Sequence, residues 1–315
     1  MKNYTIRKYQ KTDYALWNDF ISQAKNATFL FHRDFMEYHS DRFEDFSLLI
    51  FDETKLISVL PANRKGNEIF SHQGLTYGGF VTQEKLKSEA VSAVVDAVIA
   101  FLREQQFKNL FLKQLPAFYT AGGNQQTDYL LFQRGAVLYR KDMNLAVNLN
   151  EPLTVSKSKL KHFRRVSEFD LSYKQTSDFA SFWNFVLLPR LSEKHGVKPV
   201  HSLEEIENLH RFFPQQIKQF SVYHRDEIVA GITVFESDWV VKSQYGATTK
   251  LGEQLRALDY LFIHLLEHYQ KLGKPFFDMG TVNENEGRTV NWGLLNQKEE
   301  LGCSVYNQDF YKLEL

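Results

Sequence analysis

The order of the predicted elements in the first half of this chain recurs in the second half, and this recurrence limits the possible folds more than any other feature. Aligning Ser47 with Ser221 gives an offset of about 174 residues, and aligning Phe111 with Phe277 gives about 166. Each half is predicted to contain a hairpin of two strands, a third strand, a long helix and a further strand. Two copies indicate a duplicated domain rather than a solenoid. We therefore expect two α/β domains with mixed sheets.

The boundary between the two domains is expected near residue 150. A long strand predicted at 135–149 should close the first domain, and Pro152 begins the connection. A basic helix is predicted at 156–165, directly after this connection. We therefore expect the domains at residues 1–150 and 151–315.

The segment 240–280 shows the repeated pattern most clearly, as a strand, a loop, a long helix and another strand. Apolar residues recur at helical spacing from Leu255 to Leu272, and Gly273 ends the helix. A loop that leads into a helix presents free backbone N–H groups and the positive end of the helix dipole. An anionic cofactor is therefore the first hypothesis. The residues predicted to hold it are Thr248, Thr249, Lys250 and Gly252.

Charge and composition exclude several other classes of protein. Lys and Arg total 38, as do Asp and Glu, so no overall basic field attracts nucleic acid. The basic helix at 156–165 still leaves tRNA as an alternative partner. The N-terminal segment lacks the apolar core of a signal peptide, and no apolar run approaches the roughly 20 residues that span a bilayer. With a single cysteine, Cys303, the chain is expected to be cytoplasmic, without a membrane span.

The tandem order of strand, glycine-containing loop, helix and splayed strand resembles a known superfamily. Together with the basic helix at 156–165, the stretch VFESDWVVKSQYGAT and the ending NWGLLNQKEELG, it is similar to the FemAB-like branch of the acyl-CoA N-acyltransferase (GNAT) superfamily. This resemblance covers nearly the whole chain and implies two tandem GNAT-like domains. It further implies an N-acyltransferase of bacterial cell-envelope biosynthesis that uses acyl-CoA, such as acetyl-CoA. The first domain would have an acceptor or structural role, and the second would bind the donor and carry catalysis.

Acyl transfer to an amine requires a proton acceptor and donors for the oxyanion. Asp278 ends the strand that follows the long helix, where splaying would open a cleft, so it is a candidate base; Tyr245 ends the opposite strand. The resemblance implies that Lys298, which precedes Leu301-Gly302, lies near the acyl donor. Structural alternatives are a helix cap or a surface ion pair for Asp278, a core position for Tyr245 and an exposed helical site for Lys298.

The predicted acceptor is an amine on a small molecule or a lipid-linked sugar or peptide precursor of the cell surface. Polar and aromatic side chains near the cleft are typical of such a site, although they can equally satisfy loop backbone. The residues predicted to bind the acceptor are Gln244, Asn283, Asn291 and Trp292.

Two features keep other functions open. The loop 249–253 retains one glycine of the usual GNAT pyrophosphate loop, and Glu253 places a carboxylate near the expected anion. An aminoacyl-tRNA-dependent transferase and a non-catalytic GNAT-fold binding protein are therefore alternatives. The pattern formed by His264, Glu267 and His268 matches that of inverted zinc proteases. Because no third ligand is evident, we expect no metal.

Overall fold

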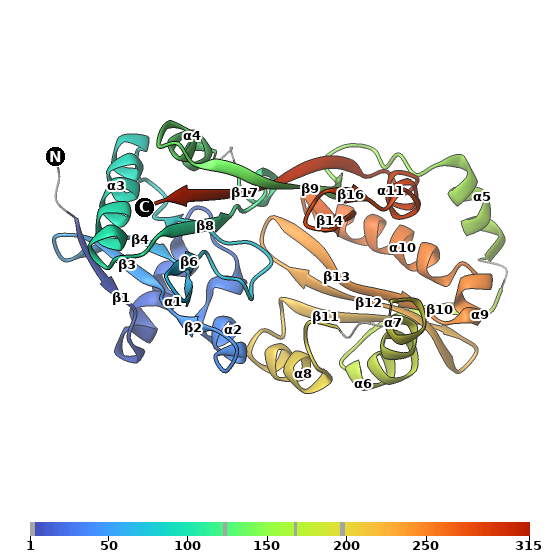
Figure 1. The fold of residues 1–315 in the computed structure, drawn as a ribbon. Coiled ribbons are helices and arrows are strands. Elements are labelled where there is room, and N and C mark those ends of the chain that lie inside the picture. Colours follow the sequence, from blue (N-terminus) through green and yellow to red (C-terminus); the bar gives the residue numbers. More distant parts are fainter. Residues whose placement is uncertain (1–3, 122–124, 167–168, 196–198) are drawn as a thin grey trace. The chain divides into compact units, whose positions relative to one another are not determined.

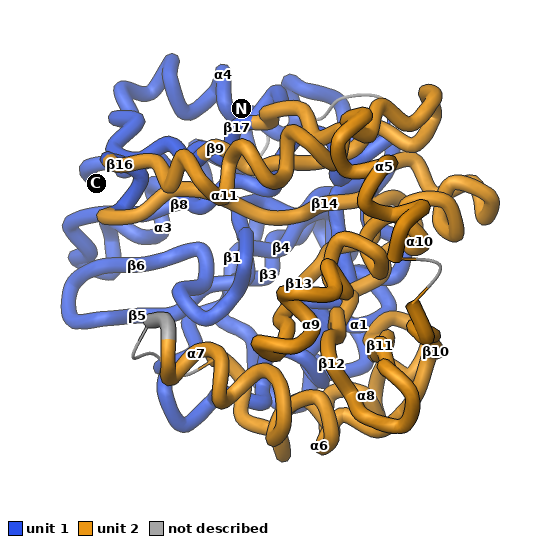
Figure 2. Tube along the Cα trace, turned by 90° about the vertical axis from the view of Figure 1, so that its right-hand side faces the viewer, with its two compact units in different colours: residues 1–142, 286–288, 307–315 blue, residues 143–285, 289–306 orange. Residues whose placement is uncertain are grey.

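The computed structural model describes residues 4–121, 125–166, 169–195 and 199–315, which form two compact units (Figures 1 and 2). Unit 1 consists of residues 1–142, 286–288 and 307–315, and unit 2 of residues 143–285 and 289–306. Both units mix helices with parallel and antiparallel strands, so the predicted α/β class with mixed sheets is confirmed.

Unit 1 packs one long helix against its strands. Within the described residues, the strands of this unit pair in the orders β1-β3-β4-β7 and β17-β8-β6-β5-β2, where β17 is Ser304–Glu314. Its helices are α1 (Tyr14–Gln23), α2 (Arg33–Met36), α3 (Ser88–Glu104) and α4 (Gln126–Gln133). The strands that lie wholly in unit 1 are β1 (Thr5–Lys8), β2 (Glu44–Asp45), β3 (Leu48–Asp52), β4 (Lys55–Leu60), β5 (Asn63–Lys65), β6 (Glu68–Phe70), β7 (Val81–Thr82) and β8 (Asn109–Lys113).

The core of unit 1 follows from the apolar face of α3. Val91, Val94 and Val98 recur at helical spacing and are fully buried, in one hydrophobic cluster with Ile50 of β3 and Leu110 of β8. The predicted hairpin of the third and fourth strands is present, and Glu53 at its turn has a φ of 53°. The hydrophobic periodicity of the sequence was therefore sufficient to predict this core.

Unit 2 is a mixed sheet with helices on both faces. Its strands pair in the order β10-β11-β12-β13-β14-β9, where β9 is Val137–Asn148. Figure 1 shows α10 over one face of this sheet and α6, α7 and α8 over the other. The helices are α5 (Lys157–Val166), α6 (Phe179–Phe182), a π-helical turn (Trp183–Leu187), α7 (Leu188–His195), α8 (Leu203–Phe212), α9 (Lys250–Gln254), α10 (Ala257–Lys271) and α11 (Trp292–Glu299). The strands are β10 (Leu171–Thr176), β11 (Ile217–His224), β12 (Glu227–Glu236), β13 (Val240–Thr248), β14 (Phe276–Thr281), β15 (Asn283–Glu284) and β16 (Thr289–Val290).

Two long strands, β9 (Val137–Asn148) and β17 (Ser304–Glu314), each contribute to both units. The strand at 135–149 was expected to close the first domain, but its residues 144–148 pair with β14 of unit 2. Conversely, residues 310–314 of β17 pair with β8 of unit 1. The strand that follows each copy of the repeat therefore completes the sheet of the other unit.

The long helix expected over 255–272 is present as α10, but the loop expected before it contains the short helix α9. Arg256 lies between α9 and α10 with a φ of 55°, a left-handed conformation that non-glycine residues rarely adopt. The backbone therefore turns at Arg256, and α10 starts afresh at Ala257. The apolar spacing placed the start of the long helix correctly to within two residues, but it gave no sign of α9 before it.

Candidate active site

The site begins where β13 and β14 separate. The two strands pair in parallel at three positions only, which join residues 240–242 to residues 276–278. Beyond Lys242, residues 243–248 keep their ladder with β12 but have no described strand on the other side. The register also shifts within β14, between Asp278 and Gly280. Two strands that splay apart in this way leave a wedge-shaped opening in the sheet.

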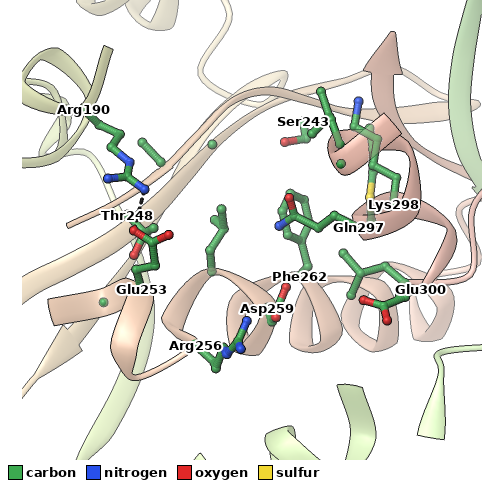
Figure 3. A pocket seen from close by; sticks show the side chains of 18 of the residues that line it. Arg190, Ser243, Thr248, Glu253, Arg256, Asp259, Phe262, Gln297, Lys298 and Glu300 are labelled. Atoms are coloured by element: carbon green, nitrogen blue, oxygen red, sulfur yellow. Dashed lines mark hydrogen bonds and ion pairs between the residues drawn. The ribbon is translucent and has the colours of Figure 1, made fainter. Parts of the chain in front are cut away.

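A cleft of about 720 Å³ occupies this opening (Figure 3). Its walls come from β13, α10, α11 and the ends of α7 and α9, all in unit 2. In Figure 3, Arg190 and Glu253 lie at one end of the cleft, and Ser243 and Lys298 lie at the other. The predicted site residues that line it are Gln244, Thr248, Gly252 and Lys298.

Lys298 lies on α11 and lines the cleft with its side chain, which is only 8% exposed. Its Nζ donates hydrogen bonds to the carbonyl oxygens of Gly280 (2.9 Å) and Thr281 (3.0 Å). Burial, and next the charge of Lys242, lower the pKa of Lys298 to about 8. A substantial fraction of this amine is therefore neutral near physiological pH.

Asp278 is close to Lys298 but does not line the cleft. Its carboxylate is 1% exposed, and Oδ2 lies 2.9 Å from Nζ of Lys242. Oδ1 accepts hydrogen bonds from Nδ2 of Asn144 (2.8 Å) and from the backbone N–H of Gly280 (2.6 Å). With both oxygens occupied inside the protein, this carboxylate is poorly placed to receive a proton from a ligand in the cleft.

Tyr245 lies on the strand between two cleft-lining residues, but its side chain does not line the cleft. Its hydroxyl is 2.5 Å from Nδ1 of His201 and accepts a hydrogen bond from the backbone N–H of that residue (3.1 Å). The ring of Trp183 packs edge-on against it, with centroids 5.2 Å apart. Burial raises the pKa of Tyr245 to about 12. The hydroxyl therefore stays protonated at neutral pH.

The predicted anion loop forms the first turn of α9. Thr249 caps this helix, because its Oγ1 accepts a hydrogen bond from the backbone N–H of Gly252 (3.0 Å). Arg190 of α7 pairs with Glu253 at 2.5 Å and so offsets the carboxylate that the sequence places here. Lys250 is exposed and lies 3.2 Å from Glu193. The loop thus combines a capped helix turn with two cations that are already paired.

Gly252 is at a position where any side chain collides with backbone. A Cβ there would overlap the carbonyl oxygen of Val229 and the hydroxyl of Thr248. We expect Gly252→Ala to lower the free energy of unfolding by about 1–3 kcal/mol through overpacking, as measured by urea denaturation. Gly293→Ala is the control, because this cleft-lining glycine lies in a helix and its Cβ would meet only Asn291, at 3.6 Å. Equal stability of the two variants would contradict this prediction.

The three other residues predicted to bind the acceptor lie at the start of α11 and in the segment before it. Asn283 belongs to the β15–β16 ribbon, and its Oδ1 accepts from the backbone N–H of Met143 (2.6 Å). Asn291 caps α11 by accepting from the backbone N–H of Leu294 (3.0 Å). Trp292, the first residue of that helix, is 66% exposed. Of these three side chains, Trp292 presents the most surface to a ligand.

Several residues in the cleft or beside it were not identified from the sequence. Lys159 of the basic helix is buried, and its Nζ contacts both carboxylate oxygens of Asp259 on α10 at 2.8 and 2.7 Å. Lys242 follows two valines at the start of β13. A lysine at this place in an apolar run was the feature of the sequence that indicated a buried ion pair. The sequence did not indicate the roles of Asn144 and Arg190, because their partners are far away along the chain.

The zinc pattern of the sequence has a different role in the structure. His264 stacks on Tyr173 with ring centroids 4.8 Å apart, and His268 packs against Tyr269. In the part of the chain that the structure describes, no three His, Cys, Asp or Glu side chains are grouped so that they could hold a metal ion. Within the same residues, no helix has the length and apolar character needed to cross a membrane.

Comparison with known proteins identifies the fold through structures alone. No family model matches the sequence, and no curated protein does. The structure of FemX has a TM-score of 0.73 at 10% identity, covering 99% of this chain and 97% of that one. L-PGS from Bacillus licheniformis has a TM-score of 0.58 at 12% identity, covering 85% and 83%. A tandem GNAT protein from the clavulanic acid biosynthesis pathway has a TM-score of 0.51 at 10% identity, covering 99% and 98%.

Proposed function

We propose that this chain, whose fold is similar to that of FemX and of a tandem GNAT protein, is an N-acyltransferase. The observation that carries this proposal is the splay between β13 and β14, which opens a cleft beside a lysine whose pKa is about 8. A direct transfer needs a slot for the acyl donor and a proton acceptor at its end. The cleft offers both within unit 2.

We assign the acyl donor to the free edge of β13. No described strand pairs with residues 243–248 on the cleft side, and an extended chain that contains amides can bind such an edge as an added strand. The pantetheine arm of acyl-CoA is a chain of this kind. Its phosphates would meet Thr248, Lys250 and the first turn of α9, with Thr249 and Gly252 fixing the turn. This is the site that the sequence predicted for an anion.

Lys298 is the group that we assign to proton transfer. When the amine is neutral, its two N–H groups satisfy the carbonyls of Gly280 and Thr281, and the lone pair is available to the acceptor. It takes a proton from the acceptor ammonium, and the freed amine attacks the acyl carbonyl carbon. The carbon–sulfur bond then breaks, the departing thiolate takes the proton that the newly acylated nitrogen still carries, and Lys298 releases its proton to solvent. The role of base thus passes from Asp278, the first candidate, to Lys298.

The acceptor in this proposal is an amine on a sugar or peptide precursor of the cell surface, either a small molecule or lipid-linked. Trp292 offers an exposed aromatic face, while Gln244, Asn283 and Asn291 supply polar groups. FemX and L-PGS, which share the fold, are consistent with this choice. We assign donor binding and catalysis to residues 151–315, and an acceptor or structural role to residues 1–150.

A thermal-shift screen with acetyl-CoA, CoA and nucleotide sugars tests the donor. A ligand that binds only the native state stabilises it by about 2.7 kcal/mol at 100 times its Kd, so acetyl-CoA should raise Tm. Lys250→Ala should reduce this shift, whereas Lys161→Ala, an exposed lysine on α5, should not.

The absence of a shift with any thioester would contradict the acyl-CoA donor. Salt-sensitive binding of tRNA to the exposed cations of α5 would instead support an aminoacyl-tRNA donor. These cations are Lys157, Lys161, Arg164 and Arg165. Binding of a ligand without any transfer of an acyl group would indicate a non-catalytic binding protein.

A further inference from the structure

A buried ion pair lies at the point where β13 and β14 separate. Lys242 and Asp278 are the last aligned residues of the two strands, and Nζ of Lys242 lies 2.9 Å from Oδ2 of Asp278. The exposed fractions of the two side chains are 13% and 1%. From β9, Nδ2 of Asn144 donates to Oδ1 of the same carboxylate at 2.8 Å. The pair therefore ties together the three strands that meet at the base of the cleft.

The ion pair is linked to Lys298 through the backbone of Gly280. The N–H of Gly280 donates to Oδ1 of Asp278 at 2.6 Å, and the carbonyl of Gly280 accepts from Nζ of Lys298 at 2.9 Å. Gly280 has a φ of 75°, in the left-handed region that favours glycine, and follows the register shift in β14. A Cβ at this residue would lie 3.4 Å from Nζ of Lys242. One backbone turn thus joins the carboxylate to the cleft lysine.

Building on the acyltransferase function proposed above, we propose that Lys242 and Asp278 are positioning residues for Lys298. Asp278 holds the Gly280 turn whose carbonyl receives Lys298, and the two opposite charges of the pair act on the protonation of Lys298 in opposite directions.

Removal of either charge of the pair should shift the pKa of Lys298 in a defined direction. The groups that act on Lys298 are Lys242 from β13, Asp278 from β14 and the Cys303 thiol just before β17. Burial has the largest effect and lowers the pKa of Lys298; Lys242 lowers it further, while Asp278 raises it. Removing Lys242 should therefore raise the pKa of Lys298, and removing the charge of Asp278 should lower it. A purely structural ion pair would not give shifts of opposite sign.

The test follows the titration of Lys298 directly, without acyl donor or acceptor. In protein labelled with 13C at the lysine ε carbon, the Lys298 signal is assigned by its absence in Lys298→Arg. Lys242→Met should move the titration midpoint up by about one pH unit or more, the typical effect of removing a nearby like charge. Asp278→Asn keeps an oxygen for Asn144 and Gly280 and should move the midpoint down.

Lys218→Met provides the matched control. Lys218 is a partly buried lysine in the same sheet, paired with Glu236 at 2.7 Å, and Glu236 keeps Lys274 at 3.1 Å when Lys218 is lost. The control should leave the Lys298 midpoint unchanged. If Asp278→Asn does not fold, Lys242→Met still decides the question, because an unchanged or lower midpoint in that variant overturns the proposal.

Activity measurements separate this inference from the function on which it rests. If the wild-type protein transfers an acyl group but the variants do not move the titration midpoint of Lys298, the positioning role is refuted and the transferase function stands. Opposite shifts in a protein that transfers no acyl group would refute the transferase and leave the positioning role intact. We expect the two variants to move the NMR titration midpoint of Lys298 in opposite directions, and to move the pH profile of kcat/KM in the same opposite directions.

Discussion

Lys298→Met is expected to lower kcat/KM for acyl transfer by roughly 10²- to 10⁴-fold, the range associated with loss of a general base. The reason is that methionine keeps the length and packing of the side chain but cannot accept a proton. In the wild-type protein, kcat/KM should rise with pH and level off above a midpoint near pH 8, because the neutral amine is the active form. Initial rates with an acyl thioester, measured between about pH 6 and pH 10, check both results.

Lys298→Arg distinguishes a base from a fixed cation. Arginine retains the positive charge and the donors but does not lose its proton in proteins. If Lys298 acts as a base, this variant should be as inactive as Lys298→Met. Substantial activity of Lys298→Arg, or a rate that falls above pH 8, would mean that the charged form stabilises the oxyanion instead.

The pH dependence of the free energy of unfolding should also reflect the lowered pKa of Lys298. The pKa of Lys298 is lowered from 10.5 to about 8 in the folded protein, so the unfolded chain binds more protons between these values. The free energy of unfolding therefore gains a contribution that rises with pH from about 8 to 10.5, and below pH 8 burial of the charged amine is a cost. Urea denaturation across this window should show a smaller rise in Lys298→Met. This check requires no substrate.

Lys159→Met is expected to lower the free energy of unfolding of unit 2 by about 3–5 kcal/mol, the cost of leaving a buried charge without its partner. Lys159 and Asp259 are each 8% exposed, and their contacts of 2.7 and 2.8 Å join α5 to the first turn of α10. Glu300, 3.7 Å from Lys159, is half-exposed and contributes less. Urea denaturation followed by tryptophan fluorescence suits this test, because Trp183, Trp239 and Trp292 all belong to unit 2.

Two further variants isolate the ion pair between Lys159 and Asp259. Lys157→Met removes an exposed lysine from the same helix and should change the stability by less than about 0.5 kcal/mol. The double variant Lys159→Met with Asp259→Leu should recover most of the loss, because apolar residues of similar volume often replace a buried pair at no cost. A single Lys159→Met variant that stays within about 1 kcal/mol of wild type would contradict a buried, desolvated pair.

The sequence was a good guide to elements and a poor one to strand partners. Apolar spacing predicted α3 and α10, and β-branched runs predicted β11, β12 and β13, since these signals are local. The exchange of β9 and β17 between units was not predictable, because a strand carries no local mark of the strand it will join. The break at Arg256 was hidden for a similar reason, as an arginine rarely adopts a left-handed φ.

In the candidate site, too, the sequence indicated local features but not contacts between residues far apart in the chain. Lys298 was identified through a family resemblance, and its burial could not be foreseen because Glu299 and Glu300 beside it suggest an exposed helix. Asp278 was placed correctly at the end of a strand, yet its role depends on Asn144, which is 134 residues away along the chain. Tyr245 faces His201 because the pleat of β13 alternates its side chains, and a bulge near that position obscured the alternation.

The exchange of the long strands also constrains how the chain can fold during synthesis. Residues 310–314 of β17, which complete the pairing of β8 in unit 1, follow all of unit 2 in the sequence. A ribosome therefore releases this strand only after the second unit has been made, although N-terminal domains usually fold first. Until then, one edge of β8 stays open, and an open edge is a site for wrong pairing. Unit 1 is thus begun first on the ribosome but completed last.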